Sequence, residues 1–518
     1  MALGAFYLGV AAWVYFARDI WMTDAVSRTG NAIYAVLSRD PHLGAIGFVW
    51  LPAPSVIQIP LVLILNLVHV PVFAGNVFSA LAATAAVWVM WRLLADLRVP
   101  GGWVVALTTV YALNPMTVYY AVVGMSESFF ILALLMVIWQ FVVWVRDRSA
   151  LSLAVGGVAL AGAVWTRYEA IPLIVAVGIA YMLHELARDE DRAAGTRAQA
   201  VLMTLLGPAV GSLILWLFFN FLIMGDPLHF VNSEYGPMAQ LRIGLRDGAG
   251  NTEVIAASKS LVAAAQFGLK RILLLSPFFV PIAIAVTARA LFRKDWRAIG
   301  VLGIGGSMVL FSVYQLGTGG SFGWLRFFMY CQPLTIVFGA VAVVDYRRSV
   351  RNAVYAALLL AMLVAVPTSA WALWRADTGL EESGPVRHMI DPASPDALVE
   401  ERMVTGQIAE YLDALPQGQL VYIQTVSSWG VAVQAKDRTR LVITNDSDAE
   451  RFLDDPVKSL DYILVPPLGG ISNNGEVIRR FPGIWENGEP WLRLEHEWKF
   501  ASGPSYRLYR VIKDGAGG

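Results

Sequence analysis

The sequence has few cysteines, few histidines and few charged side chains. Its 518 residues include one cysteine and six histidines, and only 15% are Asp, Glu, Lys or Arg. The single cysteine, Cys331, lies in an apolar run beside Gln332 and Pro333, so neither a disulfide framework nor a thiolate metal cluster is possible. The formal net charge is zero, which argues against a nucleic-acid partner because such a partner requires a basic surface.

Apolar residues are abundant instead. They make up 57% of the chain, which has a mean hydropathy of +0.57 and contains 18 tryptophans. A soluble core does not require so much apolar surface. The composition therefore predicts a polytopic α-helical membrane protein surrounded by membrane lipids.

About eleven apolar stretches are long enough to predict membrane-spanning helices. They lie at about 2–17, 73–92, 101–119, 127–145, 150–165, 169–184, 200–222, 270–291, 299–316, 326–345 and 352–373. The first lacks a basic start and a small-residue cleavage site, so we expect a retained span rather than a signal peptide. Residues 55–70 are also apolar but are interrupted by Pro60 and followed by Pro71. We expect them to lie in the membrane interface, with a full span as the alternative.

Lysine and arginine gather in alternate loops. The cation-rich loops lie at 92–98, 146–148, 188–197, 293–297 and 347–351, and the loops at 114–126, 166–168 and 317–325 hold almost none. The positive-inside rule then places the N-terminus in the cytoplasm. Because the expected number of spans is odd, the chain after Trp374 lies on the opposite side of the membrane from the N-terminus, which is the exterior. We therefore expect a multi-pass protein of the cytoplasmic (inner) membrane with an extracytoplasmic C-terminal domain.

The change in composition near residue 376 predicts a division into two domains. Residues 1–375 form the expected membrane domain, whose exterior segments include a first loop at 19–71 and a long loop at 223–269. Residues 376–514 are richer in charge and predict a small soluble α/β domain. The Gly/Ala tail at 515–518 is expected to be disordered.

Short β-type runs alternate with helical patterns in this α/β domain. Strands are expected at 420–425, 440–444 and 461–465, a terminal antiparallel pair at 491–500 and 506–512, and helices at 400–415 and 448–453. We find no Gly-rich phosphate loop, nucleophile elbow or metal-ligand spacing here. Asn445-Asp446-Ser447 follows the second strand and is either a turn and helix cap, which we favour, or a sugar-binding element.

The first exterior loop concentrates polar chemistry at a membrane boundary, where an unpaired charge is costly. Asp24 opens an expected helix at 25–37, and Arg28 lies four residues later on the same face. This pair is either a helix cap with a local ion pair or part of a site. Asp40 precedes Pro41, which suits a turn as well as substrate binding. His42 has no HxxxH or HxH partner, so a structural role competes with a binding role.

Carboxylates, arginines and aromatic residues recur at the later exterior turns. They are Glu127, Arg167 with Glu169, Glu234 with Tyr235, and Trp324 with Arg326. Glu127 follows Ser126 at the start of a span, so a helix-start role competes with binding a substrate hydroxyl or a metal ion. We treat all seven as candidate substrate-binding residues. The sequence leaves open whether the site binds a divalent cation, Mg²⁺ or Mn²⁺. Glu127 is the candidate ligand for such a cation.

Isolated carboxylates and arginines on the exterior side, without a nucleotide-binding loop, fit glycosyl transfer from a polyprenyl-phosphate sugar. The lipid carries its sugar to the exterior, so no nucleotide has to be recognised. A carboxylate would accept the proton of the acceptor hydroxyl as it attacks the anomeric carbon. An arginine would stabilise the departing phosphate. A single direct displacement inverts the configuration of the sugar carbon.

Several of these motifs together resemble the GT-C superfamily of integral-membrane glycosyltransferases. They are the stretch from Asp24 and Arg28 to Trp50-Leu51-Pro52, the turn Asn114-Pro115-Met116 with Gly124-Met125-Ser126-Glu127, and Thr166-Arg167-Tyr168-Glu169, Gly225-Asp226-Pro227 and Trp324-Leu325-Arg326. The resemblance covers about residues 1–375. It is nearest to bacterial proteins related to the family 39 protein mannosyltransferases and the lipid A aminoarabinose transferases.

This resemblance implies roles for four residues. Asp24 corresponds to the catalytic base of the superfamily, and Glu127 to an acidic residue that assists substrate or metal binding. Arg326 is the first choice for holding the lipid phosphate, and Arg167 the second. The chain has Asp40-Pro41-His42-Leu43 where many relatives have a His-Pro-Pro element. It also lacks a Trp-Trp-Asp signature, which speaks against an N-glycosylating oligosaccharyltransferase.

The sequence therefore predicts an inverting hexosyl- or pentosyltransferase. Its donor would be a polyprenyl-phosphate sugar, and its acceptor a hydroxyl of a glycan, lipid or protein. The main alternative is a transporter or flippase of lipid-linked or small polar substrates. Against it, the charges lie at helix ends rather than in mid-span, and no internal repeat is evident. A catalytically inactive scaffold is a third reading, which the presence of both Asp24 and Glu127 disfavours.

Overall fold

The computed structural model describes residues 1–187, 194–246, 252–501, 503 and 505–513. The expected disordered tail at 515–518, and parts of the loops expected at 188–197 and 223–269, lie outside this range. The chain divides into two compact units. We call them the helical unit (Met1–Ala11, Ser79–Phe218 and Gly250–Arg387) and the mixed unit (Ala12–Phe78, Phe219–Ala249 and His388–Gly518). The sequence-based boundary at 375/376 follows chain order, whereas these units interleave along the chain.

Six helices in the described part of the chain are long and apolar enough to cross a membrane. They are α4 (Ala74–Asp96), α7 (Glu127–Asp147), α10 (Ala194–Met224), α16 (Trp296–Gly317), α17 (Cys331–Ala342, together with the preceding turn from Leu325) and α18 (Arg348–Trp374). The pair α14 (Leu261–Leu275) and α15 (Phe279–Arg293) makes a seventh if counted as one span. The chain is thus a multi-pass membrane protein, and the count of eleven spans stays a prediction.

Four further expected spans are shorter apolar helices. These are the first helix, Ala2–Ala17, which ends in a π-helical turn from Trp13, and α5 (Gly101–Ala112), α8 (Ala150–Val164) and α9 (Ala170–Leu186). The expected span at 101–119 ends early, because α5 stops at Ala112 and a second helix, α6 (Pro115–Val122), follows. Asn114 caps the start of α6: its Oδ1 accepts a hydrogen bond from the Met116 N–H. Asn before Pro is a strong helix start, which explains the break.

The stretch expected to span the membrane at 270–291 is broken by a bend. The helix α14 ends at Leu275, and α15 leaves it at an angle of 103°. The break contains Ser276-Pro277, and Ser276 has the non-helical dihedrals φ −153° and ψ 85°. Proline disfavours the helical conformation of the residue before it and cannot donate its own N–H, so the bend follows from Pro277.

Glycines allow close contact between helices of the helical unit. A Cβ atom on Gly300 of α16 would lie 2.3 Å from the Phe141 ring of α7. A Cβ on Gly339 of α17 would lie 2.6 Å from the Leu358 side chain of α18. Small residues at such positions let neighbouring helices pack closely within a membrane.

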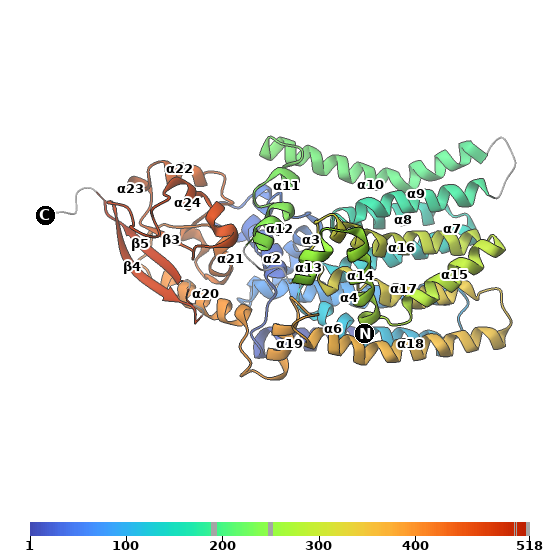
Figure 1. Cartoon of the computed structure of the whole chain (residues 1–518). Coiled ribbons are helices and arrows are strands. Elements are labelled where there is room, and N and C mark those ends of the chain that lie inside the picture. The colour runs from blue at the N-terminus through green and yellow to red at the C-terminus, as the bar shows by residue number, and fades with distance from the viewer. Residues whose placement is uncertain (188–193, 247–251, 502, 504, 514–518) are drawn as a thin grey trace. The chain divides into compact units, whose positions relative to one another are not determined.

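The mixed unit contains a five-stranded sheet at its C-terminal end (Figure 1). Its strands are β1 (Val421–Ile423), β2 (Leu441–Ile443), β3 (Tyr462–Val465), β4 (Leu492–Lys499) and β5 (Ser505–Val511). Their order is β2-β1-β3-β5-β4. The first three are parallel, while β5 runs antiparallel to both β3 and β4. The predicted α/β fold with a terminal antiparallel pair is confirmed.

Helices precede and connect the strands of this sheet. They are α20 (Ala397–Asp413), α21 (Thr425–Gln434), α22 (Ala449–Asp454), α23 (Pro456–Ser459) and α24 (Glu476–Arg480). The expected helices at 400–415 and 448–453 correspond to α20 and α22. Crossover helices are what parallel strand pairs require, because a tight turn cannot return the chain to the same end of the sheet.

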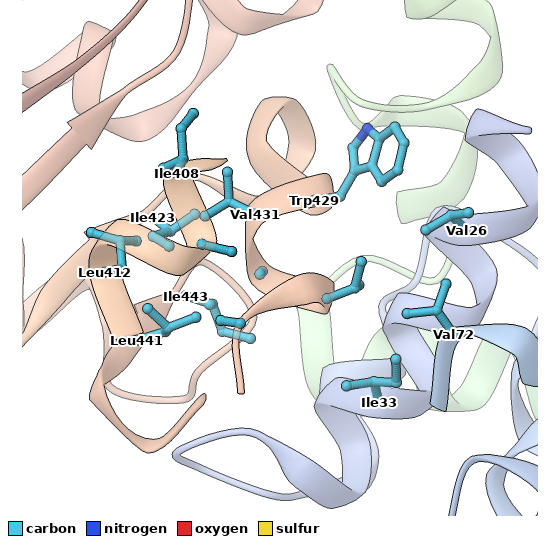
Figure 2. Close-up of a cluster of buried hydrophobic side chains, with 14 of the residues drawn as sticks. Val26, Ile33, Val72, Ile408, Leu412, Ile423, Trp429, Val431, Leu441 and Ile443 are labelled. Carbon is cyan, nitrogen blue, oxygen red and sulfur yellow. The ribbon is translucent and has the colours of Figure 1, made fainter. Parts of the chain in front are cut away.

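One hydrophobic core joins the first loop to this sheet domain. Helix α2 (Thr23–Leu37) contributes Val26 and Ile33, which belong to the same buried cluster as Ile408 of α20 and Trp429 of α21 (Figure 2). The Trp21 and Trp429 rings lie 5.6 Å apart between centroids. The first loop and the C-terminal segment therefore fold as one body through burial of apolar surface.

Helix α3 (Ala53–Asn66) covers the stretch for which we expected an interfacial helix at 55–70. It has 14 residues and contains Pro60. It packs against α2 and places Val62 in the shared core of the mixed unit. Its length is below that of a full span, and its position in the membrane interface stays a prediction.

Candidate functional site

Asp24 lies in the first turn of α2. Met22 has extended dihedrals and precedes the helix, which begins at Thr23. The aligned peptide dipoles at a helix start favour a carboxylate there. The Asp24 side chain is half-buried. Its backbone carbonyl accepts a 3.3 Å hydrogen bond from the buried Arg28 guanidinium, which lies 4.7 Å from the centre of the Trp50 ring.

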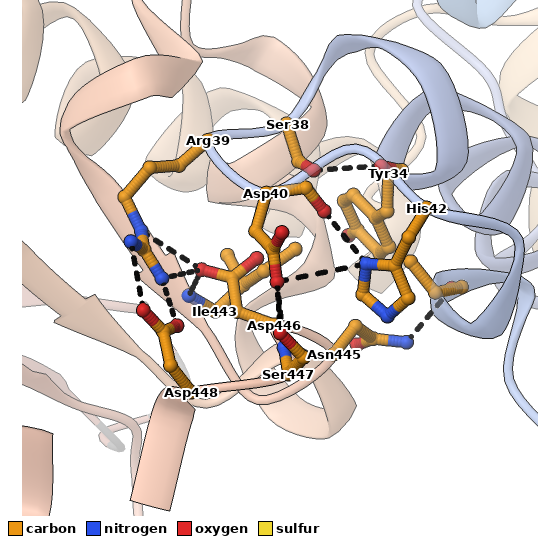
Figure 3. Close-up of polar contacts among 11 residues, drawn as sticks. Tyr34, Ser38, Arg39, Asp40, His42, Ile443, Asn445, Asp446, Ser447 and Asp448 are labelled. Carbon is orange, nitrogen blue, oxygen red and sulfur yellow. Dashed lines mark hydrogen bonds and ion pairs between the residues drawn. The ribbon is translucent and has the colours of Figure 1, made fainter. Parts of the chain in front are cut away.

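Asp40 and His42 belong to a polar network with the turn after β2 (Figure 3). The Asp40 carboxylate accepts hydrogen bonds from the Ser447 hydroxyl at 2.6 Å and its backbone N–H at 2.8 Å. These bonds hold the pKa of the Asp40 carboxyl below its ordinary value. The His42 ring lies 2.8 Å from the Asp40 carbonyl and 3.6 Å from its carboxylate. Both predicted binding residues therefore have internal partners.

Arg39, which the sequence did not single out, is the strongest link in this network (Figure 3). Its guanidinium donates to the Asp446 carboxylate at 2.9 and 3.1 Å and pairs with Asp448. Asp446 also accepts from the Ile443 N–H at 3.2 Å. Burial raises the pKa of the Asp446 carboxyl to about 6, because water no longer stabilises its charge. Asp446 and Ser447 thus act as a turn that anchors the first loop.

A pocket of about 430 Å³ lies within the mixed unit. Its walls come from one face of α2, the segment 47–50, the long loop at 224–240, and the C-terminal segment at 424–479. Glu234 and Tyr235, both predicted from sequence, line it, as does Asn445. A cavity of this size is typical of small-molecule sites, which span roughly 300–1,000 Å³.

Two half-buried carboxylates and an ion pair set the electrostatics of this pocket. Glu234 pairs with Arg479, and the Tyr235 hydroxyl donates to the Asn474 carbonyl at 2.8 Å. The Tyr422 hydroxyl donates to Glu476 at 3.4 Å. Burial raises the pKa of both the Glu476 carboxyl and the Tyr235 hydroxyl.

A second cluster of charged side chains is buried in the helical unit. Arg167 lies in the turn between α8 and α9, and it donates to Glu127 at the start of α7 and to Glu169 at 2.8 Å. Arg326, just before α17, lies 3.7 Å from the same oxygen of Glu127. Glu127 is 0% exposed, and the other three are under 9% exposed. The structure thus brings together four residues that the sequence predicted from three separate turns.

This cluster extends to residues that the sequence analysis did not identify. Glu381 lies 3.4 Å from the Arg326 guanidinium, and Glu382 accepts a 2.6 Å hydrogen bond from the Tyr120 hydroxyl. Burial raises the pKa of the Glu382 carboxyl. Both glutamates follow the last long helix, in a charge-rich stretch that also contains Arg375 and Asp377, so the sequence did not distinguish them. Arg271 of α14 fixes this segment by donating to the Thr378 carbonyl at 2.7 Å.

Aromatic rings cover the guanidinium of Arg326. Its carbon lies 4.3 Å from the centre of the Trp324 ring and 5.5 Å from that of Phe327. Arginine stacks well on aromatic faces, which keeps its planar fork in a fixed orientation. Trp324, predicted as a binding residue, therefore contacts the cluster through Arg326.

The charges of this cluster are held by pairing, because a buried charge without a partner is strongly destabilising. The guanidinium groups of Arg167 and Arg326 both form ion pairs with Glu127 Oε1. The other carboxylate oxygen of Glu127, Oε2, has no hydrogen-bond partner among the described residues. Within the same part of the chain, no group of three or more His, Cys, Asp or Glu side chains is arranged to hold a metal ion. The possible divalent cation at Glu127 stays a prediction.

The predicted site residues thus fall into two groups. Glu127, Arg167, Glu169, Trp324 and Arg326 lie in the helical unit and form one cluster. The others belong to the mixed unit: Asp24, Arg28, Asp40, His42, Glu234 and Tyr235. Of these, Glu234 and Tyr235 line the pocket. Arg28 does not line it but packs on the ring of Trp50, which does.

Comparison with known proteins identifies the fold. No family model and no curated protein sequence matches the chain. Among solved structures, apo ArnT from Cupriavidus metallidurans superposes with a TM-score of 0.56 at 13% identity, over 98% of each chain. The chain has the ArnT fold. ArnT bound to undecaprenyl phosphate gives a TM-score of 0.51 at 13% identity over 99% of each chain.

A third similar structure is the oligosaccharyltransferase AglB from Archaeoglobus fulgidus, in complex with an inhibitory peptide and a dolichol-phosphate. It has 11% identity and a TM-score of 0.45, over 99% of this chain and 74% of that chain. The likeness to ArnT extends over the whole chain, including the sheet of the mixed unit. The prediction of a polytopic helical membrane protein with a small C-terminal α/β domain is confirmed.

Proposed function

We propose that this protein is an inverting glycosyltransferase of the cytoplasmic membrane. It transfers a hexose or pentose from a polyprenyl-phosphate sugar to an acceptor hydroxyl on the outer side. The observation that carries the proposal is the buried pair Arg167 and Arg326, which share one oxygen of Glu127 in a chain with the ArnT fold. ArnT has been solved with undecaprenyl phosphate bound, which supports a lipid phosphate as the ligand of these arginines.

The two arginines suit a phosphate whose charge grows during the reaction. Guanidinium groups bind phosphate through two parallel hydrogen bonds, and their attraction is stronger in a buried site than in water. In the free protein, Glu127, Glu169 and Glu381 occupy them. An incoming phosphate would replace some of these carboxylates, and Glu127 would then accept a hydroxyl of the donor sugar.

Asp24 supplies the base in this proposal. Its carboxylate accepts the proton of the acceptor hydroxyl, whose oxygen forms a bond to the anomeric carbon. The bond from that carbon to the phosphate oxygen breaks at the same time, and polyprenyl phosphate leaves with the electron pair. Arg326 and Arg167 stabilise the added negative charge on the phosphate. One displacement inverts the anomeric configuration.

The test compares the wild-type protein with Asp24→Asn, using polyprenyl-phosphate sugars in detergent. Asparagine keeps the size of the side chain but cannot accept the proton, so transfer should fall by roughly 10²-fold or more. The thermal midpoint and donor affinity should be unchanged, because Asp24 is half-buried and does not hold the phosphate. Full activity of Asp24→Asn would remove Asp24 as the base.

A further inference from the structure

The helical unit contains an apolar groove of about 490 Å³ that the proposed reaction does not use. Its floor is α17, against which both α15 and α18 pack (Figure 1). Gly339 and Ala342 lie in this floor, and side chains of α15 and α18 form the walls. Arg289 is the one charged residue that the structure describes in the lining. The groove therefore offers an apolar surface with a charge at one end.

The length of the groove matches one leaflet of a bilayer. Along α15 its lining extends from Phe278 to Arg289. About eleven residues of an α-helix rise about 16 Å. The hydrocarbon core of a bilayer is about 30 Å thick, so one leaflet contributes about 15 Å. A single acyl chain that lies along α15 would fill the groove.

Positive charge gathers at the Arg289 end of the groove. Arg293 lies one helical turn after Arg289 on the same face of α15. The guanidinium carbons of Arg289 and Arg293 lie 5.3 and 4.9 Å from the centre of the Tyr346 ring, which comes between α17 and α18. Arg347 and Arg348 follow Tyr346 directly and are exposed, as is Arg293. We call these four arginines the cationic rim.

The carboxylates near the cationic rim do not balance its charge. Segments 289–297 and 345–348 contain six arginines and lysines but two aspartates. Both aspartates already have partners, because Asp295 accepts from Arg289 at 2.9 Å and Asp345 accepts from Arg297 at 2.9 Å. No carboxylate among the described residues forms an ion pair with the other four cations, which are Arg293, Lys294, Arg347 and Arg348. An anion at this end of the groove would therefore be attracted.

The donor lipid of the proposed reaction does not supply this anion. Arg326, which is proposed to hold the donor phosphate, precedes α17, whereas Tyr346 follows it. The 12 residues of α17 rise about 18 Å, so Arg326 and the cationic rim lie at opposite ends of this helix. A lipid whose phosphate binds Arg326 cannot place the same phosphate at the cationic rim.

The positive-inside rule accounts for basic residues in these loops, but it does not require an apolar groove that ends among them. A basic pocket between membrane helices attracts acidic lipid head groups. The apolar lining matches the acyl chain of such a lipid, and the surplus of positive charge matches its head group. An uncharged lipid would match the lining alone.

We propose that the groove binds one acyl chain of an anionic phospholipid whose phosphate binds Arg293. The chain lies along α15 and over Gly339 and Ala342. Arg293 stacks on the Tyr346 ring, which fixes the plane of its guanidinium, and a planar guanidinium binds a phosphate through two hydrogen bonds. Arg347 and Arg348 add positive charge. This binding involves neither Asp24 nor the arginines of the proposed donor site, so it goes beyond glycosyl transfer and does not depend on it.

The experiment uses the full-length protein, stripped of lipid in detergent, and native mass spectrometry to measure lipid affinity. The probes are phosphatidylglycerol and phosphatidylcholine with identical acyl chains. The wild type should bind phosphatidylglycerol about fivefold more tightly, the effect of one cation close to an anionic head group. Arg293→Ala should remove this preference and leave the affinity for phosphatidylcholine unchanged.

Arg92→Ala is the matched control for Arg293→Ala. Arg92 is also exposed and also stacks on aromatic rings, those of Trp88 and Trp139, at 5.9 and 5.6 Å, but it lies outside the groove lining. Arg92→Ala should keep the preference for phosphatidylglycerol. Equal thermal midpoints for the variants and the wild type would show that all of them fold.

Ala357→Phe tests the place of the acyl chain. Ala357 of α18 lines the groove and is exposed, so a phenyl ring at this position enters the groove. The affinity for both lipids should fall by roughly tenfold, because several methylene groups lose their contacts. Ala356→Phe changes the neighbouring exposed residue, which lies outside the lining, and should bind both lipids as the wild type does.

Equal affinity of the wild type for the two lipids would overturn the proposal. So would equal effects of Arg293→Ala and Arg92→Ala, or of Ala357→Phe and Ala356→Phe. Three other occupants would each overturn it as well: undecaprenyl phosphate that displaces phosphatidylglycerol at equal concentration, glycerol phosphate that does so without an acyl chain, or a protein dimer that Ala357→Phe dissociates. Cleavage of a polyprenyl-phosphate donor is measured separately, so failure of the proposed glycosyl transfer is distinguished from failure of this lipid site.

Discussion

At the scale of single residues, the buried charged side chains of the helical unit mark a candidate binding site. Glu127 Oε1 is shared by two arginines that come from different turns of the helical unit. Each arginine has a second carboxylate, Glu169 for Arg167 and Glu381 for Arg326. Such a cluster is costly to bury and is retained where it serves binding or catalysis. The proposed role of these arginines is therefore tested one residue at a time.

Arg326→Ala should weaken binding of the polyprenyl-phosphate donor by about tenfold to a hundredfold, the effect of one lost charge-assisted hydrogen bond or pair of bonds. Arg326→Lys keeps the charge but loses the planar fork, so its affinity should lie between those of alanine and wild type. Donor affinity is measured by titration in detergent, with the thermal midpoint as a control for folding. Unchanged affinity in Arg326→Ala would move the phosphate site elsewhere.

Pairs of elements far apart in the sequence hold the mixed unit together. Arg39 follows α2 and pairs with Asp446 and Asp448, more than 400 residues later in the chain. Local sequence patterns predicted the strands β1 to β5, because strand periodicity and turn residues are local signals. They could not predict this pairing or the shared core, since no pattern in the first loop identifies its distant partner. Pro277 was a signal in the sequence for a bend in the helix, but the apolar pattern around it favoured the prediction of a single span.

Arg39→Ala should lower the free energy of unfolding by about 1–3 kcal/mol, because it leaves the buried Asp446 without its charged partner. Chemical denaturation followed by near-UV circular dichroism measures this. The matched control is Lys458→Ala, which breaks an exposed ion pair with Asp455 and should cause no measurable change. Equal stability of the two variants would show that the network in Figure 3 does not anchor the first loop.

Glu401 of α20 predicts a pH dependence of stability. Burial raises the pKa of its carboxyl from 4.5 to about 7. Between these values the folded protein holds a proton that the unfolded chain has released, so the free energy of unfolding should fall as pH rises from about 4.5 to about 7 and then level off. Glu401→Gln should remove this component. Thermal midpoints measured from pH 4.5 to 8.5 test it, and identical pH profiles for both proteins would contradict it.

The whole molecule combines a membrane-spanning helical unit with a mixed unit in which the first loop and the sheet share a core. The ArnT fold extends over both. In the proposed reaction, Arg326 and Arg167 bind the donor phosphate and Asp24 is the base. The sequence, read one loop at a time, identified most of the charged cluster but only part of the pocket. Tyr34 and Gln424 are ordinary core residues by pattern.

The most direct test of the central claim follows the fate of a radiolabelled polyprenyl-phosphate sugar with the protein reconstituted in vesicles. A glycosyltransferase should release free polyprenyl phosphate and place the label in an acceptor with inverted anomeric configuration, and Asp24→Asn should stop both. If the intact lipid-linked sugar instead crosses the bilayer without cleavage, at the same rate in Asp24→Asn, the protein is a transporter or flippase and the account is contradicted.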